Sequence, residues 1–296
     1  MSSTPALRRI WVFADPHIGH VADGKDGAEW LEAAIDDVRT NVGKVDYVIS
    51  LGDMTHASQP EELVRYVGIR SKSGLAPWYE ISGNHDFTAL RAGLTSSIAG
   101  VSRYWSLTDG NLAFFSLPHE RCNAAGLFLP EVAAWLRQAI AGESDKNIIM
   151  CAHTFPYCTV EMSHKATRSL FPRAFVADFL RDVRVDVWLG GHIHSKPQSE
   201  ARSHQRDGTT FINAAAVSHV YGRSASLSFI LEIEPGATTM RARCRLHDEK
   251  RDLEDWSLNI TLPFPFAPQG APCFRPVPLD IPSHYGDIEA DEVESW

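Results

Sequence analysis

Short apolar runs and longer amphipathic segments alternate through the first part of the chain. Runs rich in aliphatic and aromatic residues cover 8–15, 45–53 and 76–86, and each ends in polar side chains. Between these runs, residues 27–42 and 60–72 carry apolar side chains at helical spacing. This β-α-β-α-β order favours a parallel sheet with flanking helices.

The alternation continues through the middle of the chain and changes after residue 208. The strand-like and helical segments of the middle part are 111–117, 130–142, 147–153, 173–182 and 183–191. Four short strand candidates with turns between them then follow, at 209–216, 225–234, 238–247 and 255–262. We expect these four to form hairpins on a second, mixed sheet.

The last part of the chain differs from the rest in composition. Residues 263–296 are rich in proline and then acidic. We therefore predict a domain over residues 1–262 and an extended tail over 263–296. The tail is expected to pack on the body of the protein or on a neighbouring copy, which makes a homo-oligomer compatible with the sequence.

Composition and charge narrow the class of protein. The 296 residues are 44% hydrophobic, which suffices for a large core, and the formal net charge of -9 disfavours an extended nucleic-acid surface. No segment approaches the roughly 20 apolar residues that cross a bilayer, and the N-terminus lacks a signal-peptide pattern. The 5 cysteines are odd in number and form no CxxC pair. We expect free thiols in a cytoplasmic protein without a membrane partner.

Side chains that bind metals follow five of the predicted strands. Ligands of open α/β sheets lie beyond the carboxyl ends of the strands. In this chain those ends carry Asp15, His17, Asp53, Asn84, His85, His153, His192 and His194. Two carboxylates, one amide oxygen and four of the five imidazoles would make seven ligands, which suit a pair of manganese, iron, zinc or cobalt ions and suit magnesium or calcium poorly.

Such a pair of ions would favour a negatively charged substrate. Two divalent ions against two aspartates leave a local charge of about +2. Ions roughly 3.5–4 Å apart can hold a hydroxide between them and clamp a phosphoryl group. The sequence has neither the GxxxxGK[ST] pattern of nucleotide-dependent phosphoryl transfer nor the GxSxG pattern of serine hydrolases.

In their order along the chain, these motifs resemble those of the calcineurin-like metallophosphoesterase family. That family is recognised by DxH, GD, GNH, a lone histidine and GHxH, which stand here at 15–17, 52–53, 83–85, 153 and 191–194. The resemblance covers about residues 8 to 262. It implies an α/β fold in which two mixed β-sheets pack face to face with helices outside, an αββα sandwich.

The resemblance also implies a role for each residue. Asp15, His17 and His194 would hold the first ion. Asn84, His153 and His192 would hold the second, and Asp53 would bridge the two. His85 would be a catalytic residue near the leaving oxygen rather than a ligand, stabilising charge or donating a proton.

The expected activity is hydrolysis of a small anionic phosphodiester, such as a cyclic nucleotide or a glycerophosphodiester, by the hydroxide between the ions. A phosphomonoesterase acting on a small metabolite or a phosphoprotein needs the same ligands and stays open as an alternative. A DNA nuclease is disfavoured because basic patches and extra domains are missing. A non-catalytic binding scaffold is disfavoured because all seven ligand positions are filled.

The sequence departs from the family pattern shortly after the GD motif. Many members have aspartate or asparagine there, whereas this chain has His56. His56 and His20 are either solvated loop residues or substrate contacts at the rim of the site. The segment after His153 could add Tyr157, His164 or Arg168 to the wall around the substrate. Asp86 either orients a neighbouring histidine or faces water.

Overall fold

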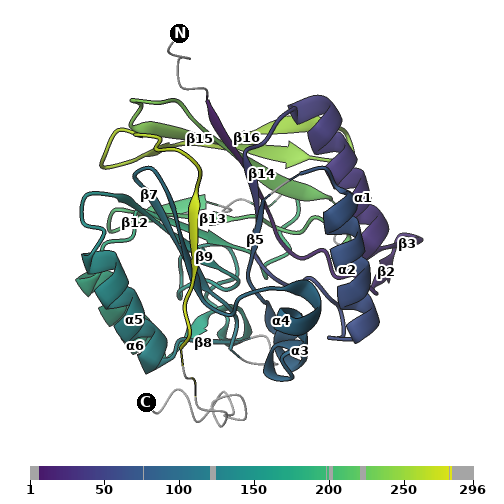
Figure 1. The fold of residues 1–296 in the computed structure, drawn as a ribbon, viewed down its shortest axis with the longest axis horizontal. Coiled ribbons are helices and arrows are strands. Elements are labelled where there is room, and N and C mark those ends of the chain that lie inside the picture. Colours follow the sequence, from purple (N-terminus) through teal and green to yellow (C-terminus); the bar gives the residue numbers. More distant parts are fainter. Residues whose placement is uncertain are drawn as a thin grey trace.

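Two β-sheets pack face to face with helices on both outer sides, in a computed structural model (Figure 1). The structure describes residues 7–75, 77–120, 125–197, 199, 203–220, 225–279 and 281. The predicted αββα sandwich is therefore confirmed. Within the described residues, no helix has both the length and the apolar character needed to cross a membrane.

The first sheet has six strands. In spatial order they are β16 (Arg251–Thr261), β15 (Thr239–Leu246), β14 (Leu227–Ile233), β1 (Arg8–Phe13), β4 (Tyr47–Ser50) and β5 (Trp78–Glu80). β1, β4 and β5 run parallel, and β14 to β16 continue the sheet antiparallel from β1. The carboxyl ends of the three parallel strands therefore meet at one edge.

The second sheet has seven strands. In spatial order they are β12 (Ser203–Arg206), β13 (Thr209–Asn213), β11 (Val187–Gly190), β9 (Asn147–Ala152), β7 (Leu112–Leu117), β6 (Trp105–Asp109) and β17 (Cys273–Pro276). β7, β9, β11 and β13 are parallel. The edge strand β12 pairs antiparallel with β13, and at the other side β6 pairs antiparallel with both β7 and the edge strand β17. The sheet thus presents a second group of carboxyl ends.

Helices cover the outer face of each sheet. The longer ones are α1 (Gly27–Asp37), which continues into a π-helical turn (Val38–Val42), α2 (Pro60–Lys72), α5 (Pro130–Ala141) and α6 (Arg173–Asp182). α1 and α2 lie on the six-stranded sheet, and α5 and α6 lie on the seven-stranded sheet (Figure 1). α1 begins with a capping box in which Asp26 accepts a hydrogen bond from Ala28 and Glu29 accepts one from Asp26.

Shorter elements lie in the connections. They are β2 (Val21–Ala22), β3 (Lys25–Asp26), α3 (Phe87–Arg91), α4 (Leu94–Ala99), β8 (Gly126–Leu127), β10 (Leu170–Phe171) and the 3₁₀ turns Asn84–Asp86 and Ala166–Arg168. β2 and β3 form a small hairpin, and β8 pairs with β10.

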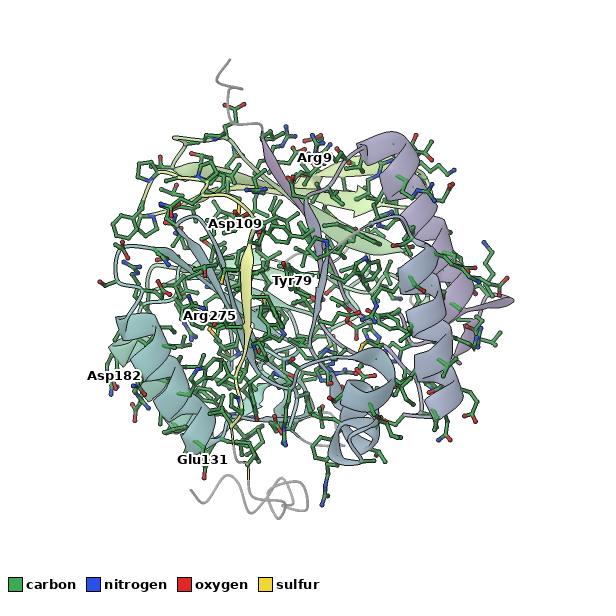
Figure 2. All side chains as sticks on the ribbon, in the orientation of Figure 1. Arg9, Tyr79, Asp109, Glu131, Asp182 and Arg275 are labelled. Atoms are coloured by element: carbon green, nitrogen blue, oxygen red, sulfur yellow. The ribbon has the colours of Figure 1, made fainter. Side chains whose placement is uncertain are left out.

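The hydrophobic core has three layers, one between the two sheets and one between each sheet and its helices. This is possible because the strands are buried on both faces. In β1, Ile10 and Val12 face the space between the sheets, while Trp11 and Phe13 pack under α1 and α2. The alternation follows from the two-residue period of a strand, and it explains why the sequence shows continuous apolar runs. Side chains fill the space between the layers (Figure 2).

The strands after residue 208 are divided between the two sheets, whereas one separate sheet was expected for them. Residues 209–213 form β13, which pairs in parallel with β11 instead of joining the hairpins that follow. β14, β15 and β16 form the expected hairpins, but they extend the sheet of β1. The prediction of one separate sheet for all four strands was wrong, because an apolar strand pattern does not encode the partner strand.

Part of the predicted tail is a strand. β17 pairs antiparallel with β6, and Phe274 stacks on Tyr79 of the other sheet with ring centroids 5.4 Å apart. Packing on the body is thus seen for this segment, and the boundary at residue 262 stays a prediction. Residues 280 and 282–296 of the predicted tail lie outside the described residues. Of the cysteines, the four that are described are free thiols, and Cys122 lies outside the described residues.

Candidate metal centre

The structure brings all eight sequence-predicted site residues to one place between the two sheets. Asp15 and His17 follow β1, Asp53 follows β4, and Asn84 and His85 follow β5, so the six-stranded sheet provides five of them. The other three come from the seven-stranded sheet, as His153 follows β9 and His192 and His194 follow β11. The carboxyl ends of the parallel strands in the two sheets therefore lie close together at this site.

Two groups of these side chains share one carboxylate, and His17 and His85 also form a third group with His56. Ligand atoms of Asp15, His17, Asp53 and His194 all lie within 4.8 Å of one another. Ligand atoms of Asp53, His153 and His192 form a second group within the same limit. Asp53 therefore belongs to both groups.

Asp53 lies midway between two imidazoles. Its Oδ2 is 3.3 Å from His17 Nε2 and 3.3 Å from His153 Nε2. Its Oδ1 accepts a hydrogen bond of 2.8 Å from the backbone N–H of His85. One oxygen thus faces both groups, while the other is fixed by the loop that follows β5.

Asp15 links the end of β1 to the loop that follows β11. Its Oδ1 is 2.9 Å from His194 Nε2 and 3.6 Å from His17 Nε2. Its Oδ2 accepts a hydrogen bond of 2.9 Å from the backbone N–H of His192. The carboxylate is buried, so its orientation is fixed by these contacts.

Asn84 and His192 complete the second group. Asn84 Oδ1 lies 3.1 Å from His153 Nε2. His192 Nε2 lies 3.2 Å from the carbonyl oxygen of Thr167, so its N–H donates there. The neutral ring then keeps its lone pair on Nδ1, which is the atom left for the centre.

The backbone at this site adopts an uncommon conformation. Asp15, His17, Asp53 and His192 have φ values of 57°, 46°, 52° and 63°, in the left-handed region. Such residues cost about 1–3 kcal/mol each, and they persist where the surroundings over-determine them. The strand ends also approach closely, since a Cβ on Gly83 would lie 2.1 Å from Asp53 Oδ1. Only glycine fits there.

The electrostatics of the buried groups indicate a site for cations. Burial alone would raise the pKa of Asp53, but the neighbouring His153 holds it well below its ordinary value. Burial would lower the pKa of His153, yet the charge of Asp53 and the hydrogen bond to it raise the pKa to about 9. Burial lowers the pKa of His17 to about 4 and that of His192 well below its ordinary value. The carboxylates thus stay charged and draw positive charge toward them.

The donor atoms around His153 fit a metal ion. His153 Nδ1 lies 2.7 Å from the carbonyl oxygen of Leu51, so the N–H donates to that oxygen. Its Nε2 then faces Asp53 Oδ2 and Asn84 Oδ1, both of which are acceptors. Acceptor atoms that converge in this way are satisfied by a proton on the ring or by a cation between them. Metal-binding histidines commonly have their second nitrogen bonded to a carbonyl in this manner.

Asp86 holds the two central loops together. Its buried carboxylate accepts hydrogen bonds from the backbone N–H groups of Met54, Thr55 and Gly83, at 2.9–3.0 Å, and from the Thr55 hydroxyl at 2.7 Å. Of the two sequence interpretations, facing water is therefore wrong. Asp86 orients backbone rather than a neighbouring histidine.

One residue of the site was missed by the sequence analysis. His119 follows β7, is buried, and has its ring centroid 5.6 Å from that of His153 and 5.7 Å from that of His192. Its Nδ1 is 2.7 Å from the Thr154 hydroxyl oxygen. His119 comes two residues after the predicted strand at 111–117, and this place beyond a strand end is the signal in the sequence that marks it.

The other suggested rim residues divide into two groups. His20 and His56 are half-buried and lie next to each other, with ring centroids 4.5 Å apart, and His56 stacks on His85 at 5.1 Å. Arg168 donates a hydrogen bond of 2.9 Å to the carbonyl oxygen of His192, which places it beside the second group. Tyr157 and His164 are exposed, and the Tyr157 ring packs under Arg173.

Solved structures share this fold at low sequence identity. A purple acid phosphatase from yellow lupin (Lupinus luteus) seeds matches with a TM-score of 0.60 and 14% identity, over 86% of this chain and 54% of that protein. The protein TT1561 of Thermus thermophilus matches with a TM-score of 0.51 and 15% identity, over 86% of this chain and 99% of the other. This chain thus spans about half the length of the lupin phosphatase.

A family model gives the sequence-level relation. No curated protein sequence matches the chain significantly. The model of the calcineurin-like phosphoesterases, however, matches residues 8–196, which is more than half of the 296 residues and includes every residue of both ligand groups. The chain belongs to the calcineurin-like phosphoesterase family.

Proposed function

We propose that this chain is a metal-dependent hydrolase with two divalent ions, which acts on a small phosphodiester of the cyclic nucleotide or glycerophosphodiester type. One observation carries the proposal. A single oxygen of Asp53 lies 3.3 Å from an imidazole nitrogen of each ligand group. A buried carboxylate between two sets of nitrogen and oxygen donors is the arrangement that a pair of ions needs.

The two groups divide the proposed ligands between the ions. Asp15, His17 and His194 would hold the first ion, and Asn84, His153 and His192 would hold the second. Asp53 would contact both. When bound, manganese, iron, zinc or cobalt ions would polarise the phosphoryl oxygens and lower the pKa of water.

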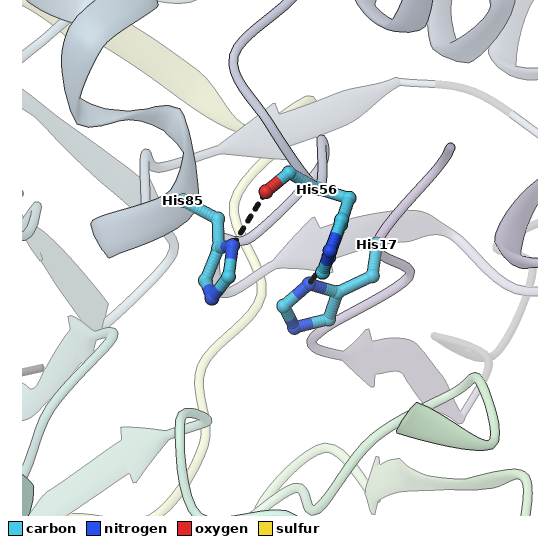
Figure 3. Close-up of side chains that lie close together, drawn as sticks. All are labelled: His17, His56 and His85. Carbon is cyan, nitrogen blue, oxygen red and sulfur yellow. Dashed lines mark hydrogen bonds between the residues drawn. The ribbon is translucent and has the colours of Figure 1, made fainter. Parts of the chain in front are cut away.

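His85 is proposed to donate a proton to the leaving alcohol. Its backbone N–H is bonded to Asp53, and its Nδ1 lies 2.6 Å from the carbonyl oxygen of His56 (Figure 3). The Nδ1–H donates to that carbonyl, which leaves Nε2 to exchange a proton with a substrate. His85 also lines a cavity of about 190 Å³ together with His56, Ala57, Ser58, Asn84 and Thr88. This cavity has room for a small alcohol group.

The role of Asp53 is tested with Asp53→Asn. The substitution removes the charge that both ions share, so we expect less than one bound ion per chain and a loss of turnover by several orders of magnitude. Asp186→Asn is the matched control, because Asp186 is also buried but precedes β11 at its opposite end. Elemental analysis and turnover of a phosphate diester measure both effects. An Asp53→Asn enzyme that keeps two ions and normal turnover would contradict the proposal.

The substrate class is tested with a panel of esters. Matched monoesters, acyclic diesters and cyclic nucleotides should be compared by kcat/KM on the metal-loaded enzyme. We expect the diesters to be preferred over the monoesters, as the proposed activity requires. A preference for monoesters would replace the proposed activity with a phosphomonoesterase and leave the metal assignment intact.

A further inference from the structure

Two proposed site histidines make hydrogen bonds to one residue that the family motifs leave out. The ring of His56 lies beside His17, with 3.4 Å between the two Nδ1 atoms (Figure 3). The backbone carbonyl of the same residue accepts the 2.6 Å hydrogen bond from His85 Nδ1 (Figure 3). His56 therefore contacts both the proposed ligand His17 and the proposed proton donor His85.

The contact between the two rings constrains where their hydrogens lie. His17 Nε2 faces the carboxylates, at 3.3 Å from Asp53 and 3.6 Å from Asp15. If Nε2 binds an ion, the hydrogen of the neutral His17 ring is on Nδ1. That N–H can then donate only to a lone pair on His56 Nδ1, so the hydrogen of the neutral His56 ring is on Nε2.

We propose that His56 is a positioning residue, which holds His17 in the tautomer and orientation that bind the first ion and holds His85 through its carbonyl. The inference rests on the proposed function. It assigns a role to the position where this chain departs from the family pattern. A ligand histidine that is held through its second nitrogen typically loses affinity for the metal by about 10–100-fold when that partner is removed.

The neighbouring rings keep His56 in place. The ring of His56 contacts that of His20, at 4.5 Å between centroids, and that of His85, at 5.1 Å. The planes of His56 and His85 are inclined by only 23°. Ring stacking thus fixes the plane of His56, and with it the direction of the lone pair on Nδ1.

The chain allows a matched pair of substitutions at this position. His56→Asn places an acceptor oxygen where Nδ1 lies, while His56→Leu places a methyl group there, and both keep the backbone carbonyl that His85 needs. His204→Asn is the control, because His204 is an exposed histidine on the edge strand β12 and is outside the ligand groups. Binding of Mn²⁺ or Zn²⁺ to the full chain, after removal of metal by chelation, is measured by calorimetry.

We expect His56→Leu to weaken one of two binding steps by about 10–100-fold and to leave the other unchanged. His56→Asn and His204→Asn should stay within a few-fold of the wild type. Equal affinities in wild type and His56→Leu would overturn the inference. Complete loss of one ion in both His56 variants would also overturn it, because His56 would then be a ligand.

A spectroscopic measurement tests the tautomers directly. In Zn²⁺-loaded protein with ¹⁵N-labelled histidine, we expect His17 as the Nδ1–H form and His56 as the Nε2–H form. The opposite tautomer at either ring would contradict the inference. A wild-type chain that binds fewer than two ions would contradict the proposed function itself. Two bound ions with the wrong tautomers would contradict only the role of His56.

Discussion

At the scale of single residues, His85 differs from its neighbour Asn84 in what its side chain contacts. Both residues line the adjacent cavity, but Asn84 Oδ1 faces His153, whereas the His85 ring is bonded to the His56 carbonyl. We expect His85→Ala to keep both ions. Hydrolysis of esters with alkyl leaving groups should slow by about 10²–10⁴-fold, while activated aryl esters should be affected less, because they depart without a proton. Turnover across a series of leaving-group pKa values measures the difference.

A second residue of the same cavity provides the control for that experiment. Thr88 lines the cavity but is exposed and carries no group that titrates near neutral pH, so Thr88→Ala should leave the leaving-group dependence unchanged. Loss of one ion in His85→Ala would make His85 a ligand and would contradict its assignment. An equal loss of rate for every leaving group would remove the proton-donor role.

At the scale of elements, a buried ion pair joins helix α1 to strand β15. Asp37 accepts two hydrogen bonds from Arg245, at 2.7 and 2.8 Å, and a third from His247 Nδ1 at 2.8 Å. Burial would raise the pKa of Asp37, but the hydrogen bonds from Arg245 and His247 hold it well below its ordinary value. Asp37→Asn leaves the guanidinium without its main partner, so we expect a loss of about 3 kcal/mol in the free energy of unfolding at neutral pH.

Because the pKa of Asp37 is lowered in the folded protein, the contribution of this ion pair to the free energy of unfolding depends on pH. Its contribution is fully present above the unfolded-state pKa, near 3.9, and is lost as the pH falls toward the folded-state value. The difference in the free energy of unfolding between wild type and Asp37→Asn should therefore stay at about 3 kcal/mol from pH 5 to 7. It should shrink below about pH 4. Urea unfolding at several pH values measures it, with exposed Asp36→Asn as the control. A difference that grows on acidification would be the wrong sign.

Some elements could be predicted from the sequence, and others could not. The ranges 60–72 and 173–182 match α2 and α6 at both ends, because proline or a preceding loop starts each helix and the apolar spacing is regular. The edge strands β12 and β17 were not predicted, since their side chains are mostly exposed and show no apolar pattern. Their pairing depends on the neighbouring strand, which a local pattern does not contain.

The candidate site was predictable because parallel strands end at a common edge. That rule placed Asp15, Asp53 and His153 near one another although they are far apart in sequence. The same rule did not give the position of His56, which lies within a loop. Its contact with His17 follows from how the loops after β1 and β4 pair, through a bridge between Ile18 and Thr55. Loop pairing of this kind has no signature in a single sequence.

At the scale of the whole molecule, the acidic charge should limit the range of substrates. With a formal net charge of -9, the protein as a whole repels polyanions, whereas the proposed metal centre would attract a single phosphate group. We expect kcat/KM for a small diester to change only slightly between low and moderate salt. A polymer that makes several phosphate contacts would instead show a slope near -0.9 per contact in a double-logarithmic plot. A steep slope with a nucleic acid as the better substrate would reverse the proposed ranking.

The two sheets contribute comparable shares of the candidate centre. Asp15 and His194 are 179 positions apart in sequence and meet only when the sheets are packed. Ions bound there would link the two sheets of the sandwich. Each ion, at a free concentration of about 100 times its Kd, would add about 2.7 kcal/mol to the free energy of unfolding. A chelator should therefore lower the Tm of the wild type and have little effect on Asp53→Asn.

A change of about 1–2 kcal/mol is enough to alter the abundance of a protein in a cell several-fold. Scarcity of metal would then reduce the number of enzyme molecules as well as the activity of each one.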